Sequence, residues 1–165
     1  MKYQIVPLER CHVPFVSAVY EENIDILHGG QVSTEEWEKC LISEKDATEE
    51  NFIVIIDGND VAWLKLNGLD TGNLYVSMLV VAKEYQRCGI GSFAMNFAES
   101  FALDLSKKSV ALLTTADNLA AISLYKKLGY LIQSKVRYTT GDGVIRDGYK
   151  FVKNVEANDE YKTLY

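Results

Sequence analysis

The clearest chemical signature lies in residues 73–92, which read NLYVSMLVVAKEYQRCGIGS. Gly89 and Gly91 remove side chains where an apolar stretch is expected to turn into a helix. Successive backbone N–H groups can then converge on an anion at the positive end of the helix dipole, and a diphosphate fits such a cradle. Two glycines at this spacing also occur in ordinary turns, so the interpretation depends on the elements that flank them.

Two strands and a helix are predicted around this loop. Residues 74–81 contain one clearly polar side chain, Ser77, and residues 110–115 are similarly apolar. Such runs are typical of strands inside a sheet that is covered on both faces. Between them, apolar residues repeat at steps of three and four, which marks one face of a helix. These residues are Ile90, Phe93, Ala94, Phe97, Ala98, Phe101 and Leu105. The three elements predict a parallel βαβ unit.

The first half of the chain is predicted to supply antiparallel strands and two helices. Residues 2–6 can form a short strand, and residues 13–22 carry apolar side chains on one helical face. Ser33 and Glu36 can form a capping box that opens a second helix toward residue 42. Residues 52–56 and 61–66 flank Asp-Gly-Asn-Asp, whose composition suits a hairpin turn.

The second half adds a further helix and a final hairpin. Ala121, Leu124, Tyr125 and Leu128 share a helical face that ends at Gly129, and residues 131–138 and 146–152 flank Gly-Asp-Gly. The sequence therefore predicts an α/β fold with a mixed, mostly antiparallel sheet and one parallel βαβ unit. We expect a single domain over residues 1–153 and a polar C-terminal tail over residues 154–165.

Composition restricts the classes of function. The 165 residues are 48% hydrophobic and 24% charged, with no apolar run resembling a signal peptide or a membrane span, so a cytoplasmic protein is expected. Cys11, Cys40 and Cys88 lack CxxC spacing, which predicts neither disulfides nor a metal site. The net charge of −6 disfavours nucleic acid and favours cationic partners.

Two motifs resemble those of the GNAT superfamily of N-acetyltransferases. Residues 86–91, QRCGIG, match the Q/R-x-x-G-x-G/A signature and follow an apolar strand, as in that family. About 30 residues after Gly89, residues 118–130, NLAAISLYKKLGY, are similar to the second family signature. The close resemblance covers residues 73–130. It implies a GNAT-like fold in which the strands at 74–81 and 110–115 splay apart around acetyl-CoA.

The resemblance also implies which residues hold acetyl-CoA. The backbone of Leu79, Val80 and Val81 would bind the pantetheine arm. Asn118 would touch the pantetheine side, and Tyr125 would lie near the thioester sulfur as the catalytic acid. The diphosphate would be bound by the backbone of Gln86, Arg87, Cys88, Gly89, Ile90, Gly91 and Ser92.

Several of these residues also have ordinary structural roles. Asn118 can cap the helix that follows it, and the ring of Tyr125 can simply fill the apolar face of that helix. Cys88 reads as a loop residue, because direct acetyl transfer needs no nucleophilic cysteine. His12 and His28 have no partner at the spacing of a metal site or a catalytic triad, which predicts structural or exposed histidines.

The acceptor and the general base stay open. Acetylation of a primary amine requires removal of a proton at neutral pH, because an alkylammonium has a pKa near ~10. Many relatives carry a glutamate in the strand at 74–81, whereas residues 75–78 here read Tyr-Val-Ser-Met. Candidates are Glu21, Glu22 and Asp25, or a water held by Ser77. The acidic composition favours a cationic amine of a small molecule or peptide, and a homodimer is compatible with the sequence.

Two rival functions are considered. Residues 89–94 also satisfy G-x-G-x-x-A, and Asp117 follows the next strand as in a dinucleotide-binding fold. Seven residues separate the first strand from Gly89, which argues against that fold. The other rival is a non-catalytic acyl-CoA-binding module, which the missing strand glutamate would explain.

Overall fold

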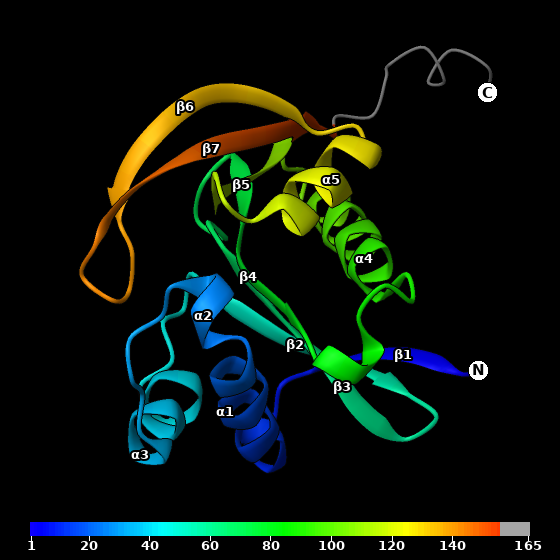
Figure 1. Ribbon diagram of the computed structural model, residues 1–165. Coiled ribbons are helices and arrows are strands. Elements are labelled where there is room, and N and C mark those ends of the chain that lie inside the picture. Colours follow the sequence, from blue (N-terminus) through cyan, green and yellow to red (C-terminus); the bar gives the residue numbers. More distant parts are fainter. Residues whose placement is uncertain (156–165) are drawn as a thin grey trace, which may run out of the picture.

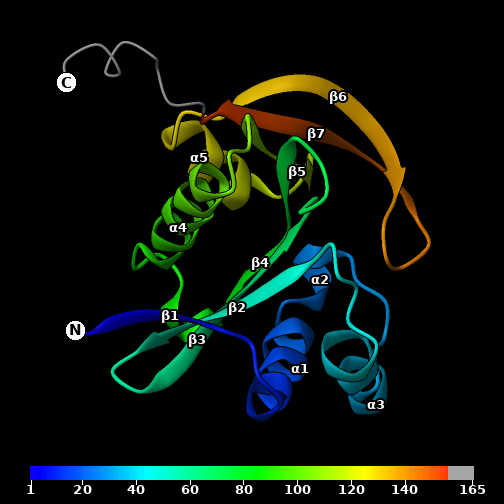
Figure 2. The same cartoon turned by 180° about the vertical axis from the view of Figure 1, so that it is seen from behind.

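A seven-stranded mixed sheet forms the centre of the computed structural model, which describes residues 1–155. The strand order is β1-β2-β3-β4-β5-β7-β6, and β4–β5 is the parallel pair while the other neighbours run antiparallel. Helices α4 and α5 cover one side of the sheet, and α1, α2 and α3 lie on the other side, as Figures 1 and 2 show. The predicted fold class is confirmed.

The strands are β1 (Tyr3–Pro7), β2 (Glu50–Ile56), β3 (Asn59–Asn67), β4 (Asn73–Val81), β5 (Ser109–Thr115), β6 (Leu131–Thr139) and β7 (Ile145–Asn154). The helices are α1 (Val13–Glu22), α2 (Ile24–Leu27), α3 (Thr34–Glu38), α4 (Ile90–Asp104) and α5 (Leu119–Lys127). Short helical turns occupy Arg10–His12, Lys39–Ser43 and Lys83–Tyr85.

Local sequence signals place the first elements correctly. The β2–β3 turn contains Asp57 and Gly58 at φ 49° and 85°, the left-handed conformation that hairpin turns require. The capping box before α3 forms in both directions, because Glu36 N donates to Ser33 Oγ at 3.2 Å and Ser33 N donates to Glu36 Oε2 at 2.7 Å. The α-helix ends at Glu38, and a wider π-helical turn continues toward residue 42.

The core divides between the two sides of the sheet. Beneath α4 and α5, buried side chains such as Leu74, Met95 and Phe151 form one cluster. Beneath α1 and α3, Trp37 packs edge-on against Trp63 with ring centroids 5.4 Å apart. These two packed layers hold β4 from both sides and so determine its course.

Strands β4 and β5 pair over only three residues each. Asn73–Tyr75 lie opposite Ser109–Ala111, and beyond this short ladder the two strands diverge (Figure 1). Both faces of β4 carry packed side chains, but the strand is less uniformly buried than its apolar sequence predicted, because buried residues alternate with exposed or half-buried ones. The splay that the family resemblance implied is present.

A β-bulge accompanies the divergence. Lys65 of β3 pairs with Met78 and Leu66 pairs with Val76, so Ser77 is an extra residue in β4. Because a bulge shifts the alternation of side chains by one residue, Val76 packs toward α4 and Val80 packs toward α1.

The C-terminal strand is longer than expected. β7 runs through Asn154, which pairs with Ser109, and Val155 is buried. The predicted tail began at residue 154, so its first two residues belong to the ordered domain. The rest of that tail, residues 156–165, lies outside the described residues.

Candidate functional site

A cleft of about 990 Å³ opens where β4 leaves β5. It is lined by the far half of β4, the loop that leads into α4, the start of α5 and the segment joining α1 to α2. The predicted cofactor residues that line it are Leu79, Val80, Val81, Gln86, Arg87, Gly89, Ile90, Gly91, Ser92, Asn118 and Tyr125. Cys88 is the exception, being exposed with its Sγ 3.5 Å from the Gln86 carbonyl oxygen.

The glycine loop has the geometry of an anion cradle. Arg87 and Gly89 have φ values of 62° and 83°, and Gly89 is the residue that precedes α4. The N–H groups of the first helical turn have no acceptor within the helix, so they are available to a ligand in the cleft. A Cβ added at Gly89 would meet nothing within 4 Å, so backbone conformation rather than crowding requires glycine there.

Gly91 has a different role from Gly89. Its added Cβ would lie 2.9 Å from Leu124 Cδ2, whereas its φ is not in the left-handed region. The missing side chain lets α5 pack closely on the first turn of α4. The two glycines of the motif therefore serve the turn and the helix contact, respectively.

A hydrogen-bond cluster ties the loop to α1 and β4. Gln86 Nε2 donates to Asn23 Oδ1 and to the Val81 carbonyl oxygen, both at 3.0 Å. Asn23 is buried and donates to the Val19 carbonyl oxygen at 2.8 Å. The side chain of Gln86 is thus held by hydrogen bonds within the fold, and the residue also lines the cleft. Sequence reasoning missed Asn23, which belongs to no motif.

Tyr125 presents a buried aromatic ring to the cleft. The ring packs against Tyr130 and Phe151, with centroids 6.0 and 5.7 Å away. Burial raises the pKa of the Tyr125 hydroxyl to about 12, so the hydroxyl carries its proton at neutral pH.

Asn118 combines two roles that the sequence left open. Its Oδ1 accepts a hydrogen bond from Ala121 N at 3.2 Å, which caps α5, and the residue also lines the cleft.

The structure separates the candidates for a general base. Glu22 Oε1 accepts from Lys83 N at 2.8 Å and so anchors the loop. Asp25 is exposed and lines the cleft, whereas Glu21 is exposed without lining it. Ser77 lies at the β4 bulge and is hydrogen-bonded to the side chain of Asn67.

His28 has a partner that the sequence did not reveal. Its Nε2 lies 2.8 Å from Asp117 Oδ2, across 89 residues, and its side chain is 12% exposed. Asp117 Oδ1 accepts from the Thr115 hydroxyl at 2.6 Å, and this bond together with His28 lowers the pKa of Asp117. The pair joins α2 to the β5–α5 loop. It supports the structural interpretation of His28 and gives Asp117 a different role from that of a ribose-binding acid.

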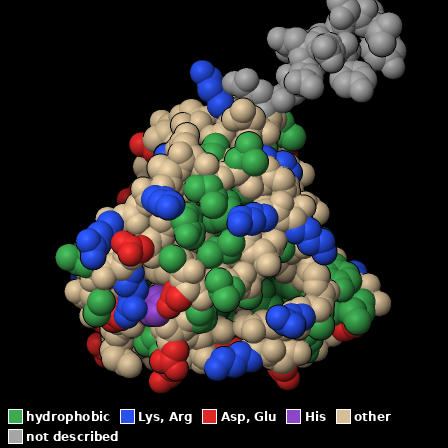
Figure 3. Space-filling model, turned by 45° about the horizontal axis from the view of Figure 1, so that its top comes forward, with side chains coloured by type: hydrophobic (Ala, Val, Ile, Leu, Met, Phe, Trp, Pro, Cys, Tyr) green, Lys and Arg blue, Asp and Glu red, His purple; other side chains and the backbone are tan. Residues whose placement is uncertain are grey.

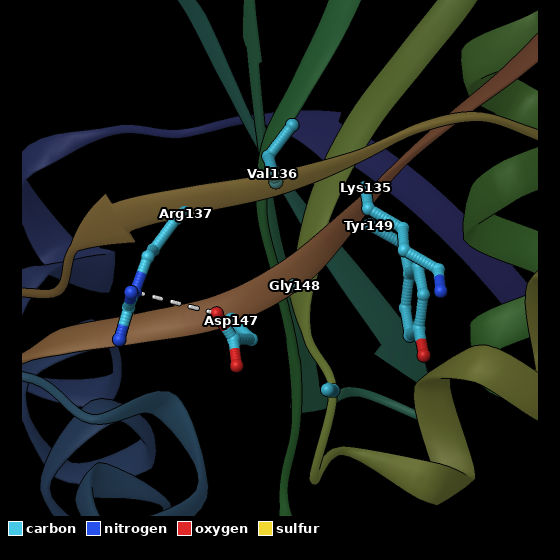
Figure 4. A pocket seen from close by; sticks show the side chains of 7 residues that line it. Lys135, Val136, Arg137, Asp147, Gly148 and Tyr149 are labelled. Atoms are coloured by element: carbon cyan, nitrogen blue, oxygen red, sulfur yellow. Dashed lines mark ion pairs between the residues drawn. The ribbon is translucent and has the colours of Figure 1, made fainter.

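A second pocket of about 450 Å³ lies between the β6–β7 hairpin and the end of β5 (Figure 4). Its lining includes Lys135, Tyr149 and an ion pair between Arg137 Nε and Asp147 Oδ1 at 3.5 Å. None of the predicted site residues lies there. Both members of the ion pair are largely exposed, so the pocket is a solvated groove on the hairpin.

The molecular surface carries both hydrophobic and basic side chains. Hydrophobic side chains gather along the middle of the face shown in Figure 3, with lysine and arginine side chains on both sides.

Within residues 1–155, no helix is long and apolar enough to cross a membrane. The same part of the chain contains no cluster of three or more His, Cys, Asp or Glu side chains suited to a metal ion.

The splayed parallel pair, the glycine loop at the start of α4 and the mostly antiparallel sheet define the fold of the N-acetyltransferases. The ribosomal-protein-S18-alanine N-acetyltransferase of Escherichia coli superposes with a TM-score of 0.75 at 22% identity over 99% of both chains. Spermidine N-acetyltransferase of Vibrio cholerae, solved with CoA and spermine, gives 0.80 at 19% identity over 92% of this chain and 95% of that one.

Sequence comparison identifies the family. Residues 16–130 match the acetyltransferase (GNAT) family, and the chain belongs to it. The catalytic subunit NAA20 of the N-terminal acetyltransferase B complex of Arabidopsis thaliana is 33% identical over 92 residues. That match covers 54% of this chain and 51% of the relative, so the chain spans about half the length of that protein.

Proposed function

We propose that the protein transfers the acetyl group of acetyl-CoA to a primary amine by direct attack in a ternary complex. The observation that carries the proposal is the convergence of three separate segments, 79–81, 86–92 and 118–125, on one cleft. Strand order speaks against the dinucleotide-binding alternative, because that fold requires a mostly parallel sheet.

The residues of the cleft fit acetyl-CoA. The first turn of α4 offers unpaired N–H groups to the diphosphate, and the open space beside Gly89 admits the phosphates close to the backbone. Residues 79–81 of β4 have no strand partner on the side of β5, so the backbone groups that point to that side can bind the pantetheine arm. When bound, acetyl-CoA supplies an acetyl group activated as a thioester.

Backbone alternation selects the donor that stabilises negative charge on the carbonyl oxygen during transfer. Ala82 N donates to the Val61 carbonyl oxygen of β3 at 2.9 Å. In an antiparallel pair, the N–H groups of alternate residues point to the partner strand, so Val80, two residues before Ala82, also directs its N–H to β3. The N–H of Leu79 points to the opposite, open side of β4. Leu79 N–H is therefore the better oxyanion donor than Val80 N–H.

Proton transfers are assigned to side chains at the cleft. Tyr125 donates its proton to the leaving thiolate, because it lines the cleft and its hydroxyl is protonated at neutral pH. The attacking amine loses a proton to Asp25 or to a water held by Ser77. We propose a cationic acceptor, supported by the net charge of −6 and by the exposed carboxylate of Asp25 at the cleft.

Two measurements, made one after the other, test the proposal. A thermal shift assay should show stabilisation by acetyl-CoA but not by NAD or NADP, and ligand at 100 times its Kd adds about 2.7 kcal/mol to the free energy of unfolding. A CoA-release assay across polyamines, amino acids, aminoglycosides and peptides then identifies the acceptor. Binding without turnover on any amine would favour the non-catalytic module, and stabilisation by NAD alone would contradict the proposed cofactor.

A further inference from the structure

Ser77 lies at the fork between β4 and β5. It comes two residues after Tyr75, the last β4 residue paired with β5, and two residues before Leu79, which lines the cleft. As the bulged residue it has no direct partner on β3, and its side chain is exposed. Ser77 itself is not part of the cleft lining, but its exposed side chain lies at the fork, two residues along β4 from the stretch that lines the cleft.

A chain of side-chain hydrogen bonds leads from Ser77 into the fold. The Ser77 hydroxyl bonds to Asn67 Oδ1, and Asn67 Nδ2 donates to Glu49 Oε1 at 2.8 Å. Lys65 Nζ lies 3.2 Å from the other carboxylate oxygen of Glu49. The Glu49 side chain is only 17% exposed, so the carboxylate is held by its neighbours.

The chemistry of the chain determines its direction. An ionised carboxylate only accepts hydrogen bonds, so Asn67 must direct its NH₂ group toward Glu49 and its carbonyl oxygen toward Ser77. Ser77 then donates its only hydrogen to Asn67, and the lone pairs of its oxygen stay available. An amine or ammonium brought to the fork would meet a hydrogen-bond acceptor.

We infer that Ser77 accepts a hydrogen bond from the acceptor amine, and that Asn67 and Glu49 are positioning residues that fix the polarity of its hydroxyl. This inference rests on the proposed acetyltransferase function and deepens it. It implies that the substrate group bound at the fork carries N–H donors. It also explains how β4, which has no carboxylate, can orient an amine.

A matched pair of residues provides the control. Ser109 Oγ donates to Asn73 Oδ1 at 2.8 Å, where β4 and β5 are still paired. The chemistry of this serine–asparagine pair is the same, but it lies at the closed end of the strands. Ser109→Ala therefore removes an equivalent bond away from the fork.

The experiment is steady-state kinetics with the best amine from the panel. Ser77→Ala should raise the KM for the amine about 5- to 10-fold, as expected for one hydrogen bond, with the KM for acetyl-CoA unchanged. Ser77→Thr retains the hydroxyl and should restore the wild-type value. Glu49→Gln should raise the same KM by a smaller factor, because an amide can also donate to Asn67 and reverse the chain. Ser109→Ala should leave both KM values unchanged.

Several outcomes would overturn the inference: an unchanged amine KM in Ser77→Ala, an equal rise in both KM values, or no rescue by threonine. Melting temperatures of all variants verify folding. If the wild type released no CoA with any amine, the proposed reaction would fail. Calorimetric titration of spermidine and of an alanine-terminated peptide into the CoA-saturated proteins would then test Ser77 separately, and equal affinity in wild type and Ser77→Ala would exclude it as an amine ligand.

Discussion

The two ends of the β4–β5 pair have opposite characters. At the closed end, Asn73–Tyr75 pair with Ser109–Ala111, and Leu74 and Val110 are fully buried beneath α4. At the open end, β4 runs beside a cleft, carries a bulge at Ser77 and leaves backbone groups without a strand partner. One strand thus provides core packing over its first residues and a ligand-binding edge over its last ones.

This difference shows how a small domain combines stability with an exposed polar edge. Unpaired backbone groups in a sheet are costly unless a ligand or water satisfies them. Here α4 and α5 stabilise the closed end, and the layer of α1 and α3 supports the open end from the opposite side through Val80. Substitutions at the closed end should therefore affect folding, and those at the open end should affect binding and turnover.

The largest effect is expected at the closed end. Leu74→Ala removes a fully buried side chain, which should cost about 2–5 kcal/mol of unfolding free energy and lower Tm by roughly 10 °C. Thermal unfolding measures the loss, and kcat per folded molecule should stay within about twofold of wild type. A large fall in kcat with an unchanged Tm would contradict the division between the two ends.

At the open end, Tyr125→Phe should lower kcat about 10²-fold with little change in acetyl-CoA affinity, at the lower end of the range for general acids because a thiol leaves easily. Since the pKa of Tyr125 is raised to about 12, the loss should be constant between pH 7 and 9. Tyr130→Phe is the control, because that ring is also buried but does not line the cleft. An unchanged kcat, measured while chemistry limits the rate, would exclude Tyr125 as the acid.

The two motif glycines should respond differently to valine. Gly89→Val should weaken acetyl-CoA binding at least about tenfold, because the side chain would enter the space offered to the diphosphate. Gly91→Val should instead cost about 1–3 kcal/mol of stability through its contact with Leu124. The sequence assigned both glycines to the diphosphate cradle, and the packing of α5 gives Gly91 a structural role instead.

Gly58 separates backbone strain from ligand binding in that experiment. It has φ 85°, close to that of Gly89, and its added Cβ also meets nothing within 4 Å. Gly58→Val should therefore lose about as much stability as Gly89→Val, of the order of 1–2 kcal/mol, without losing acetyl-CoA affinity in calorimetric titration. Native affinity in Gly89→Val would exclude the loop as the diphosphate site.

The smallest effect concerns acid stability at the open end. The pKa of Asp117 is lowered by the Thr115 hydroxyl and by His28. The contribution of Asp117 to the free energy of unfolding is therefore complete above the unfolded-state pKa of about 3.9, and it is lost as the pH falls below that value. Asp117→Asn should lower Tm slightly at pH 7, and the two Tm curves should converge below about pH 3. Because the carboxylate is more than half exposed, the shift should be small. Parallel curves across this range would contradict the assignment.

Local patterns in the sequence determined most of the elements. The capping box at Ser33, the hairpin turn at Asp57–Gly58, the helix stop at Gly129 and the βαβ unit are all as predicted, because each depends on residues within a few positions of one another. The two motifs likewise predicted the segments that line the cleft. Periodicity and turn chemistry are local properties, and a single sequence displays them directly.

Only the tertiary structure decided what depends on contacts between distant segments. His28 meets Asp117 across 89 residues, and Gln86 meets Asn23 across 63, so neither pair leaves a spacing signal. The bulge at Ser77 and the end of the β4–β5 ladder follow from how two packed layers position β4, which its apolar run did not reveal. Residue types fix which bonds a side chain can form, but the packing of the whole chain decides which partner comes within reach.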